Sequence, residues 1–160
     1  MKDLLLNLLA AALWVSLTER PTFGNWLLGF VIGHLGLYGV ARVMPALKLE
    51  AYLRRSRALV RLAGFFLWEL LLSNLKVAGD VVRAHPTHQP AVLAFPMKAR
   101  TDVEITLLTI LVILTPGTLA LDVDEEAHVL YVHVLDTPDP EAFRRELAEG
   151  FEARILEVTR

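Results

Sequence analysis

The sequence contains no cysteine among its 160 residues. The chain can therefore form neither a disulfide framework nor a metal site with thiolate ligands, and its composition fits a reducing compartment. Acidic residues are also scarce in one part of the chain, because residues 1–100 contain 12 lysines and arginines but only 5 aspartates and glutamates. A chain of this length has room for one domain, or for a membrane segment and one small domain.

The remaining 13 acidic residues lie in residues 101–160, where only 4 basic residues accompany them. The formal charge is thus +7 for residues 1–100 and −9 for residues 101–160. An acidic module repels phosphate groups, so nucleic acid is not an expected partner. Familiar catalytic patterns are missing too, including a P-loop and a glycine-rich dinucleotide motif. We expect no catalytic residue, no cofactor and no metal ion, and hence a protein that is not an enzyme.

Long apolar stretches fill the first part of the chain and raise its mean hydropathy to +0.46. Residues 4–18 carry no charge and would form about 22 Å of helix, which is short of the ~30 Å hydrocarbon core of a membrane. Residues 23–43 would form about 32 Å of helix, which is enough to cross it. We expect a multi-pass membrane protein in which residues 1–44 form a transmembrane hairpin of two helices.

The second of these helices carries glycines on spacings of three and four, at Gly29, Gly33 and Gly36. In lipid, small residues on one face let another helix approach closely. We expect these glycines to pack against a partner helix, either the first helix or a helix of another protein. His34 lies in the middle of the same span, where a polar side chain is costly. Its imidazole either relays protons or is neutral and hydrogen-bonded to a partner helix.

Residues 45–56 contain Lys48, Arg54 and Arg55 beside the single acidic residue Glu50. They predict a basic loop, which stays in the cytoplasm under the positive-inside rule. A soluble module that follows this loop without a further crossing is then cytoplasmic as well.

Residues 57–84 predict one long amphipathic helix with a polar stripe within about 40° of one line, formed by Glu69, Ser73, Lys76, Asp80 and Arg83. We favour a helix that lies in the membrane interface or packs on a neighbouring subunit. The other interpretation is a third span, which would place Glu69 near mid-depth and the following module outside the cell. Glu69 is a candidate for protonation within the membrane, although the stripe favours a solvated or paired side chain.

Residues 91–160 predict a soluble α+β domain with elements in the order β-α-β-β-α and helices on one face of the sheet. Pro96 marks the first strand as an edge strand or its end. Thr101 and Glu104 have the spacing of a capping box, and Pro116 with Gly117 ends the apolar helix that follows. That helix is apolar on nearly every side, so it must be buried on more than one face or contact the membrane.

Two alternating runs, residues 118–123 and 129–135, predict a β-hairpin in which Leu119, Leu121 and Val123 point inward. His133 lies on its second strand, and we expect it at a surface or an interface. Asp139 and Pro140 begin a last helix. Its core stripe consists of residues spaced by four, namely Phe143, Leu147, Phe151 and Ile155.

The segments 4–18, 25–33, 68–78, 114–123, 130–136 and 139–158 together resemble the E subunit (MrpE, MnhE or PhaE) of the Mrp-type multisubunit cation/proton antiporters of prokaryotes. The most specific motifs are LTPGT at 114–118 with LYVHVLD at 130–136, and ELLLSN at 69–74. The resemblance implies a small protein of the cell (inner) membrane that supports assembly of a complex exchanging sodium or another monovalent cation for protons. Large subunits would hold the ion path. The partners would be those subunits and the lipid bilayer, with contacts at Glu69, Asn74, Thr115, Pro116, Gly117 and His133.

Two other classes of function stay open at this point. The chain could be a membrane-anchored small-ligand-binding or regulatory protein unrelated to transport, which ligand binding by residues 86–160 would indicate. It could also be a self-sufficient transporter made by homo-oligomerisation, which ion exchange by the purified chain alone would indicate.

Overall fold

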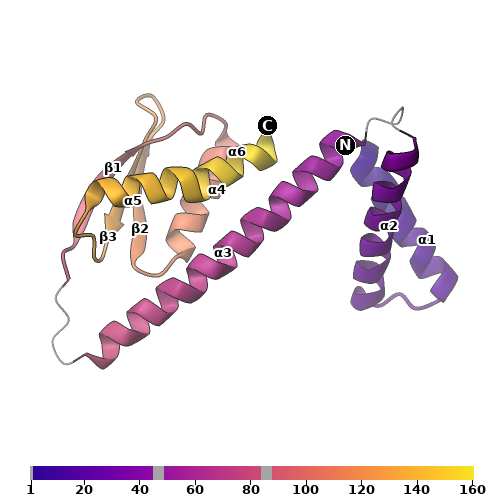
Figure 1. Ribbon diagram of the computed structural model, residues 1–160, viewed down its shortest axis with the longest axis horizontal. Coiled ribbons are helices and arrows are strands. Elements are labelled where there is room, and N and C mark those ends of the chain that lie inside the picture. The colour runs from indigo at the N-terminus through magenta and orange to yellow at the C-terminus, as the bar shows by residue number, and fades with distance from the viewer. Residues whose placement is uncertain (1, 45–48, 84–87) are drawn as a thin grey trace. The chain divides into compact units, whose positions relative to one another are not determined.

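The computed structural model describes residues 2–44, 49–83 and 88–160. The chain divides into two compact units, Met1–Ser56 and Arg57–Arg160. Figure 1 shows the elements in chain order: helices dominate the first half, and a small sheet with further helices follows. This mixture of helices with a small antiparallel sheet confirms the predicted fold class at that level.

The first unit is built from α1 (Lys2–Thr18), α2 (Phe23–Val43) and the first turns of α3 (Glu50–Val82). α1 and α2 run antiparallel, since Trp14 donates from its indole nitrogen to the side-chain oxygen of Asn25 at 3.0 Å and Asn7 lies opposite Gly33. The side chain of Thr22 caps α2 by accepting a hydrogen bond from the backbone of Asn25. Two consecutive apolar helices thus form a hairpin.

α3 begins at Glu50, seven residues before the predicted start, so the predicted loop is wrong over residues 50–56. Arginine is a good helix former, and Arg54 and Arg55 are exposed to solvent within the helix. Leu49 and Leu53, four residues apart, are only 3% and 5% exposed. Their burial gives the first turn of α3 an apolar anchor that the charge pattern concealed. Residues 45–48 of the predicted loop lie outside the described residues.

Among the described residues of the second unit, three antiparallel strands form a sheet in the order β1-β3-β2. They are β1 (Ala91–Pro96), β2 (Thr118–Asp124) and β3 (Val129–Val134). The helices are α4 (Asp102–Leu114), α5 (Pro140–Leu147), the π-helical turn η2 (Ala148–Glu152) and α6 (Ala153–Thr159). Pro96 is the last residue of an edge strand, which confirms the prediction drawn from its missing N–H.

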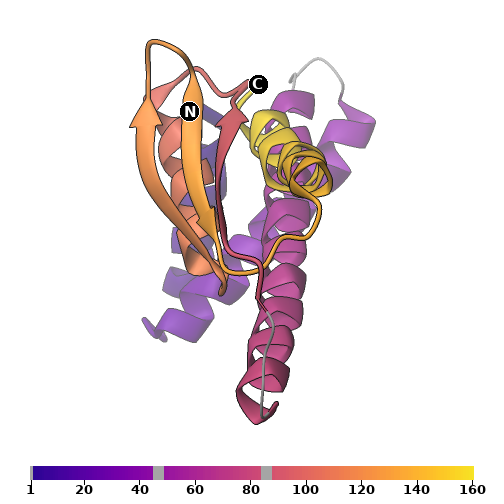
Figure 2. The same cartoon turned by 90° about the vertical axis from the view of Figure 1, so that its left-hand side faces the viewer.

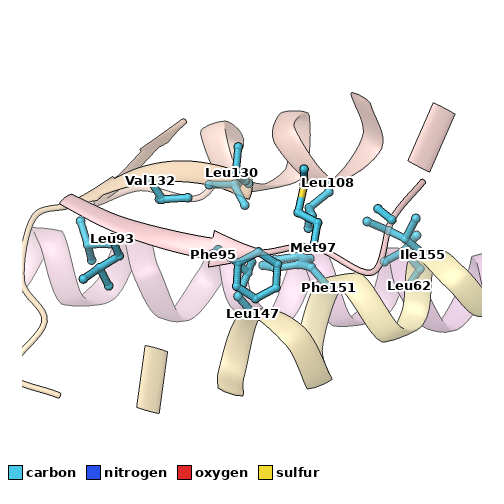
Figure 3. Close-up of a cluster of buried hydrophobic side chains, with 13 residues drawn as sticks. Leu62, Leu93, Phe95, Met97, Leu108, Leu130, Val132, Leu147, Phe151 and Ile155 are labelled. Atoms are coloured by element: carbon cyan, nitrogen blue, oxygen red, sulfur yellow. The ribbon is translucent and has the colours of Figure 1, made fainter. Parts of the chain in front are cut away.

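One face of the sheet forms the core of this unit. The register places Leu93 opposite Val132 and Phe95 opposite Leu130, so all four side chains point the same way. Leu62 from α3, together with side chains of α4 and the C-terminal helices, closes the core over them (Figure 3). The segment of α3 beyond residue 57 is therefore part of this unit's core.

The inward set of β2 matches the prediction at Val123 and differs from it at Leu119 and Leu121. Leu119 and Leu121 are 47% and 51% exposed, whereas Ala120 and Val123 pack against the core. The cause is a β-bulge between Ala120 and Asp122, which changes the phase of the side-chain alternation along the strand. Leu119 and Leu121 therefore lie on the other face of the sheet, and Figure 2 shows that face toward the viewer with α4 behind the strands.

The predicted starts of α4 and α5 and the predicted C-terminal stripe are confirmed. Thr101 and Glu104 form a reciprocal capping box, and the side chain of Asp139 caps α5 with Pro140 at its first position. The stripe residues Leu147, Phe151 and Ile155 are buried, and Phe143 packs beside them. These features depend on residues close together in sequence, which is why the local pattern was sufficient to find them.

Candidate functional site

The three most specific motifs of the family resemblance meet at one cavity in the second unit, with a volume of about 300 Å³. α3 contributes residues of the ELLLSN segment, the α4–β2 loop contributes residues of LTPGT, and the end of β3 contributes the third wall. Phe143, Glu146, Leu147 and Phe151 close the cavity from the C-terminal helices. Sequence positions as far apart as 69, 116 and 136 thus form one site.

The polar stripe of α3 faces this cavity, where Glu69, Ser73, Lys76 and Asp80 form one wall. The stripe thus turns toward the chain's own α+β domain. The opposite face of the helix is apolar and exposed, with Trp68 at 58% and Leu75 at 61%. An amphipathic helix on the surface of a soluble protein normally packs its apolar face on the core and exposes its polar face. In α3 the polar face packs on protein and the apolar face is left uncovered.

Ion pairs connect α3 to the α+β domain at Arg61 and at Lys76. Nζ of Lys76 lies 3.2 Å from Oδ2 of Asp136, and Arg61 pairs with Glu157 at 3.0 Å. The other carboxylate oxygen of Asp136 accepts a hydrogen bond from the backbone N–H of Gln89 at 3.2 Å. The Gln89 hydrogen bond, followed by the Lys76 ammonium, holds the pKa of Asp136 below its ordinary range.

An aromatic contact fixes the middle of the same interface. Phe65 of α3 meets the ring of Phe151 edge-on, with ring centroids 5.2 Å apart. The guanidinium carbon of Arg154 lies 3.9 Å from the centroid of the Phe65 ring, a cation–π geometry. Arg154 also donates to the backbone carbonyls of Glu149 and Gly150, both at 2.8 Å. Arg154 thus links the π-helical turn to the Phe65 ring of α3.

Two carboxylates that line the cavity, those of Glu69 and Glu146, take no part in these ion pairs. Within the described ranges, neither Glu69 nor Glu146 forms an ion pair or a hydrogen bond. Their charges repel one another, and among the described residues Arg154 partly offsets that repulsion at Glu69. The cavity therefore combines apolar walls with two carboxylates that have no ion-pair partner among the described residues.

The LTPGT loop is held by its own hydroxyl groups. Thr115 donates to the carbonyl of Leu111 at 2.9 Å, and Thr118 donates to the carbonyl of Val112 at 2.6 Å. Gly117 has a φ of +92°, which confirms that glycine is used there for its left-handed backbone. The helix α4 ends where Pro116 and Gly117 predict, and the chain turns directly into β2.

Two buried glutamates hold the connection between β1 and α4. Glu152, in the π-helical turn, is 1% exposed and accepts hydrogen bonds from the backbone N–H groups of Lys98 and Ala99. Glu104 accepts from the backbone N–H groups of Arg100 and Thr101. The sequence pattern missed Glu152, because its partners are more than 50 residues away.

The side chain of Glu104 stays ionised in spite of its burial. Burial opposes the charge, but it is outweighed by hydrogen bonds from the Arg100 backbone, the Arg160 and Thr159 side chains and the Thr101 backbone, so the pKa falls to about 2. The hydroxyl of Thr159 donates to Oε1 of Glu104 at 2.7 Å, and Nε of Arg160 donates to the same oxygen at 3.2 Å. This carboxylate thus ties the end of α6 to the start of α4.

In the first unit, two of the three predicted glycines bring the helices together. A β-carbon on Gly33 would collide with Oδ1 of Asn7, and one on Gly29 would lie 3.0 Å from the carbonyl oxygen of Ala11. The partner of this face is therefore α1. Gly36 faces open space instead, with no atom of the described residues within 4 Å of its β-carbon position.

His34 belongs to a small polar layer in the first unit. The amide nitrogen of Asn7 donates to the hydroxyl of Tyr52 at 2.9 Å, and the Tyr52 ring meets the imidazole of His34 edge-on at 5.4 Å. Nε2 of His34 and Oγ of Ser56 share a hydrogen bond of 3.3 Å. Oδ1 of Asn7 is buried and has no partner within the described part of the chain. Tyr52 and Ser56 were missed because they fall in the predicted loop.

Comparison with known proteins agrees with this architecture. The family model described as "Na+/H+ ion antiporter subunit" (MNHE) matches residues 7–158, nearly the whole chain. The chain belongs to this family. It is 37% identical over 158 residues to the E subunit of the Na(+)/H(+) antiporter of Alkalihalophilus pseudofirmus, covering 99% of this chain and 98% of that one. It is 32% identical to the corresponding protein of Bacillus subtilis, again over 99% of this chain and 98% of that one.

Solved structures give a second comparison for this antiporter subunit. The chain is similar to one chain of an archaeal membrane-bound sulfane sulfur reductase, a respiratory membrane complex, with a TM-score of 0.56 over 95% of this chain and 98% of that one. At 19% identity this likeness concerns the fold alone. A chain of the Mrp complex from Dietzia sp. is 29% identical, with a TM-score of 0.49, covering 64% of this chain and 96% of that one.

Family membership makes this chain a subunit of a Na+/H+ antiporter and a membrane protein. Two of its described helices, α2 and α3, are long and apolar enough to cross a membrane, and α1 is a shorter apolar helix. Its relatives are transporter subunits rather than enzymes. Nowhere in the described ranges do three histidine, aspartate or glutamate side chains gather in a way that could hold a metal ion.

Two further predicted interface residues lie outside the cavity. Asn74 is exposed on the apolar face of α3, where its amide nitrogen donates to the carbonyl of Leu70 at 2.6 Å. This bond to the helix's own backbone satisfies part of its polarity. His133 is half-buried on the open face of the sheet, opposite Val92 and Leu119. Both positions leave these side chains open to a partner of the antiporter subunit.

Proposed function

We propose that this chain is an accessory subunit that supports the assembly and stability of a multisubunit Na+/H+ antiporter and does not carry its ion path. The observation that supports this most directly is the distribution of polarity on α3, whose charged side packs on the chain's own domain while its apolar side is exposed. An uncovered apolar face of this length calls for lipid or protein to cover it. The partners proposed here are the other antiporter subunits and the bilayer.

The polar layer of the first unit supports the same proposal. Asn7 lies against Gly33, the neighbour of His34, so both polar side chains sit at one level of the α1–α2 hairpin. An ion or proton path must cross ~30 Å of hydrocarbon, which needs polar groups at several depths. A single layer is better suited to fixing the packing of α1, α2 and the start of α3.

The same proposal places α3 in the membrane interface rather than across it. Its contacts with the domain extend from Arg61 to Lys76, which is about 22 Å of helix. If this segment crossed the bilayer, the charged domain beside it would have to enter the hydrocarbon, at a cost of several kcal/mol for each unpaired ion. The helix would instead lie flat, with Leu67, Leu71 and Leu75 toward the lipid. The basic residues at its start favour the cytoplasmic side.

Single nitroxide labels test this orientation, because the chain has no native cysteine. Leu67→Cys, Leu71→Cys and Leu75→Cys would each carry one label in the full chain in liposomes. A flat helix predicts the same shallow depth, about 5–10 Å into the membrane boundary, for all three. A spanning helix predicts depths that differ by about 6 Å for each step of four residues, and this result would refute the interfacial placement.

Labelling of Glu125→Cys tests on which side of the membrane the α+β domain lies. Glu125 lies in the exposed turn of the β2–β3 hairpin. A membrane-impermeant maleimide should label the introduced thiol in inside-out vesicles and leave it unlabelled in right-side-out vesicles. The opposite labelling pattern would place the α+β domain outside the cell.

A further inference from the structure

We propose that the cavity between α3 and the LTPGT loop receives a lysine or arginine side chain from a neighbouring subunit of the antiporter. This inference rests on the accessory function proposed above and names the contact by which the domain holds its neighbour. The volume of about 300 Å³ lies at the lower end of the range for ligand pockets, which suits one long side chain.

The charge of the cavity calls for a cation from outside the unit. Glu69 and Glu146 both line it, and within the described ranges neither has an ion-pair partner. The cations nearby are already engaged, since Lys76 pairs with Asp136 and Arg154 lies on the Phe65 ring. An incoming ammonium or guanidinium group would offset the repulsion between the two free carboxylates.

The walls suit the apolar stem of such a side chain. Leu72, Pro116 and Phe143 line the same cavity as the two carboxylates. Lysine and arginine bury their methylene stems against apolar surface while the charged end meets a carboxylate. An inorganic cation has no apolar part that could pack against these walls.

The rim of the cavity favours a protein neighbour over a free amine. Leu72 and Leu135 line the cavity and are 43% and 37% exposed. Leu72 also borders the uncovered apolar face of α3, so one surface runs from that face into the cavity. A polypeptide that inserts a basic side chain would cover this rim, whereas a small amine would leave it in water.

A single introduced cysteine reports on the occupancy of the cavity. Ser73→Cys places the only thiol of the chain in the cavity wall, and Glu125→Cys in the hairpin turn, outside the cavity, serves as the control. Each variant is compared as the purified full chain in detergent and as part of the co-expressed antiporter complex. We expect N-ethylmaleimide to label the thiol at position 73 at least tenfold more slowly in the complex, with the rate at position 125 unchanged.

Charge removal then tests the role of the two carboxylates. E69Q/E146Q in the Ser73→Cys background should restore labelling in the complex and lower the yield of co-purified subunits about tenfold. E125Q/E126Q removes the same charge from the hairpin turn and should change neither. E146Q alone should give an intermediate labelling rate and an intermediate yield of co-purified subunits. Because Glu146 is exposed, this single variant keeps the test valid if the double variant does not fold.

Three results would overturn this inference. If the chain co-purifies with its neighbours while the Ser73→Cys thiol is labelled as fast as in the isolated chain, the cavity is empty in the complex, and the accessory function stands without it. If hexylammonium protects this thiol in the isolated chain while the complex does not, the occupant is a free amine. If no other subunit co-purifies with the chain, the accessory function and this inference fail together.

Discussion

Gly150 lies so close to Phe65 that a β-carbon at Gly150 would be 3.0 Å from Cζ of the ring. This contact joins the π-helical turn to α3 and lets the helix approach the domain along its polar face. Because α3 is docked in this way, its apolar face is exposed and its carboxylates line a cavity. The proposed contacts with lipid and with a neighbouring subunit both follow from this one packing arrangement.

Gly150→Ala should weaken the docking of α3. The added methyl group meets a packed aromatic ring, and overpacking of this kind costs about 1–3 kcal/mol. Gly64→Ala on α3 is the matched control, because its β-carbon position has open space among the described residues. The control should leave stability unchanged or raise it by up to about 1 kcal/mol through helix propensity. Chemical denaturation of the purified chain measures both, and equal stability of the two variants would contradict the packing described.

The lowered pKa of Glu104 predicts that the folded chain loses stability in acid. Its pKa is lowered from 4.5 to about 2, so the folded state favours the ionised form. The corresponding stability is present above pH 4.5 and is lost as the pH falls from 4.5 toward 2. Glu104→Gln should cost about 1–3 kcal/mol at neutral pH and flatten this part of the pH profile. Glu149→Gln, at an exposed side chain, should preserve the profile. Unfolding free energies measured from pH 2 to 7 decide between these outcomes.

Gly33→Ala and Gly36→Ala should differ, although both replace a glycine of the same helix. The first places a methyl group against Oδ1 of Asn7, and the second places it in open space. We expect a loss of about 1–3 kcal/mol for Gly33→Ala in detergent and little change for Gly36→Ala. If Gly36→Ala leaves the isolated chain stable but lowers the yield of the complex, the prediction that Gly36 packs on a partner helix is supported. Equal stability of the two variants would argue against the α1–α2 contact.

Pro116→Ala tests the LTPGT loop as a device that sets the angle between α4 and the β2–β3 hairpin. Without proline the helix can continue past Thr115, and the hairpin and one wall of the cavity would shift. We expect a lower yield of assembled antiporter from cells that express this variant. A variant that assembles and exchanges sodium as well as the parent chain would refute the role given to this loop.

The sequence predicted those features that depend on neighbouring residues. The capping box at Thr101, the cap at Asp139 and the stop at Gly117 each involve contacts within a few positions, so the pattern alone located them. The predicted inward face of β2 was wrong at Leu119 and Leu121, because the bulge between Ala120 and Asp122 arises from pairing with β3 and cannot be recognised from the alternation within one strand. The hairpin of two apolar helices followed from segment length and composition.

The candidate site was only partly predictable for the same reason. The residues of ELLLSN and LTPGT could be named from the sequence, but their meeting at one cavity depends on the docking of α3. Gly150 could have been noticed, since an isolated glycine inside a helical pattern often marks close packing. The roles of Tyr52 and Ser56 were not predicted, because the arginines around them indicated a loop. The burial of Leu49 and Leu53, which shows that this segment is helical, is known only from the structure.

The central claim is that this chain holds the antiporter together without conducting ions. The most direct measurement is Na+/H+ exchange per assembled complex, in membranes from cells with and without this chain, with the assembled complex quantified on native gels. The account predicts that loss of the chain lowers the amount of assembled complex while exchange per remaining complex is unchanged. Full assembly combined with abolished exchange would contradict it and place this chain on the ion path.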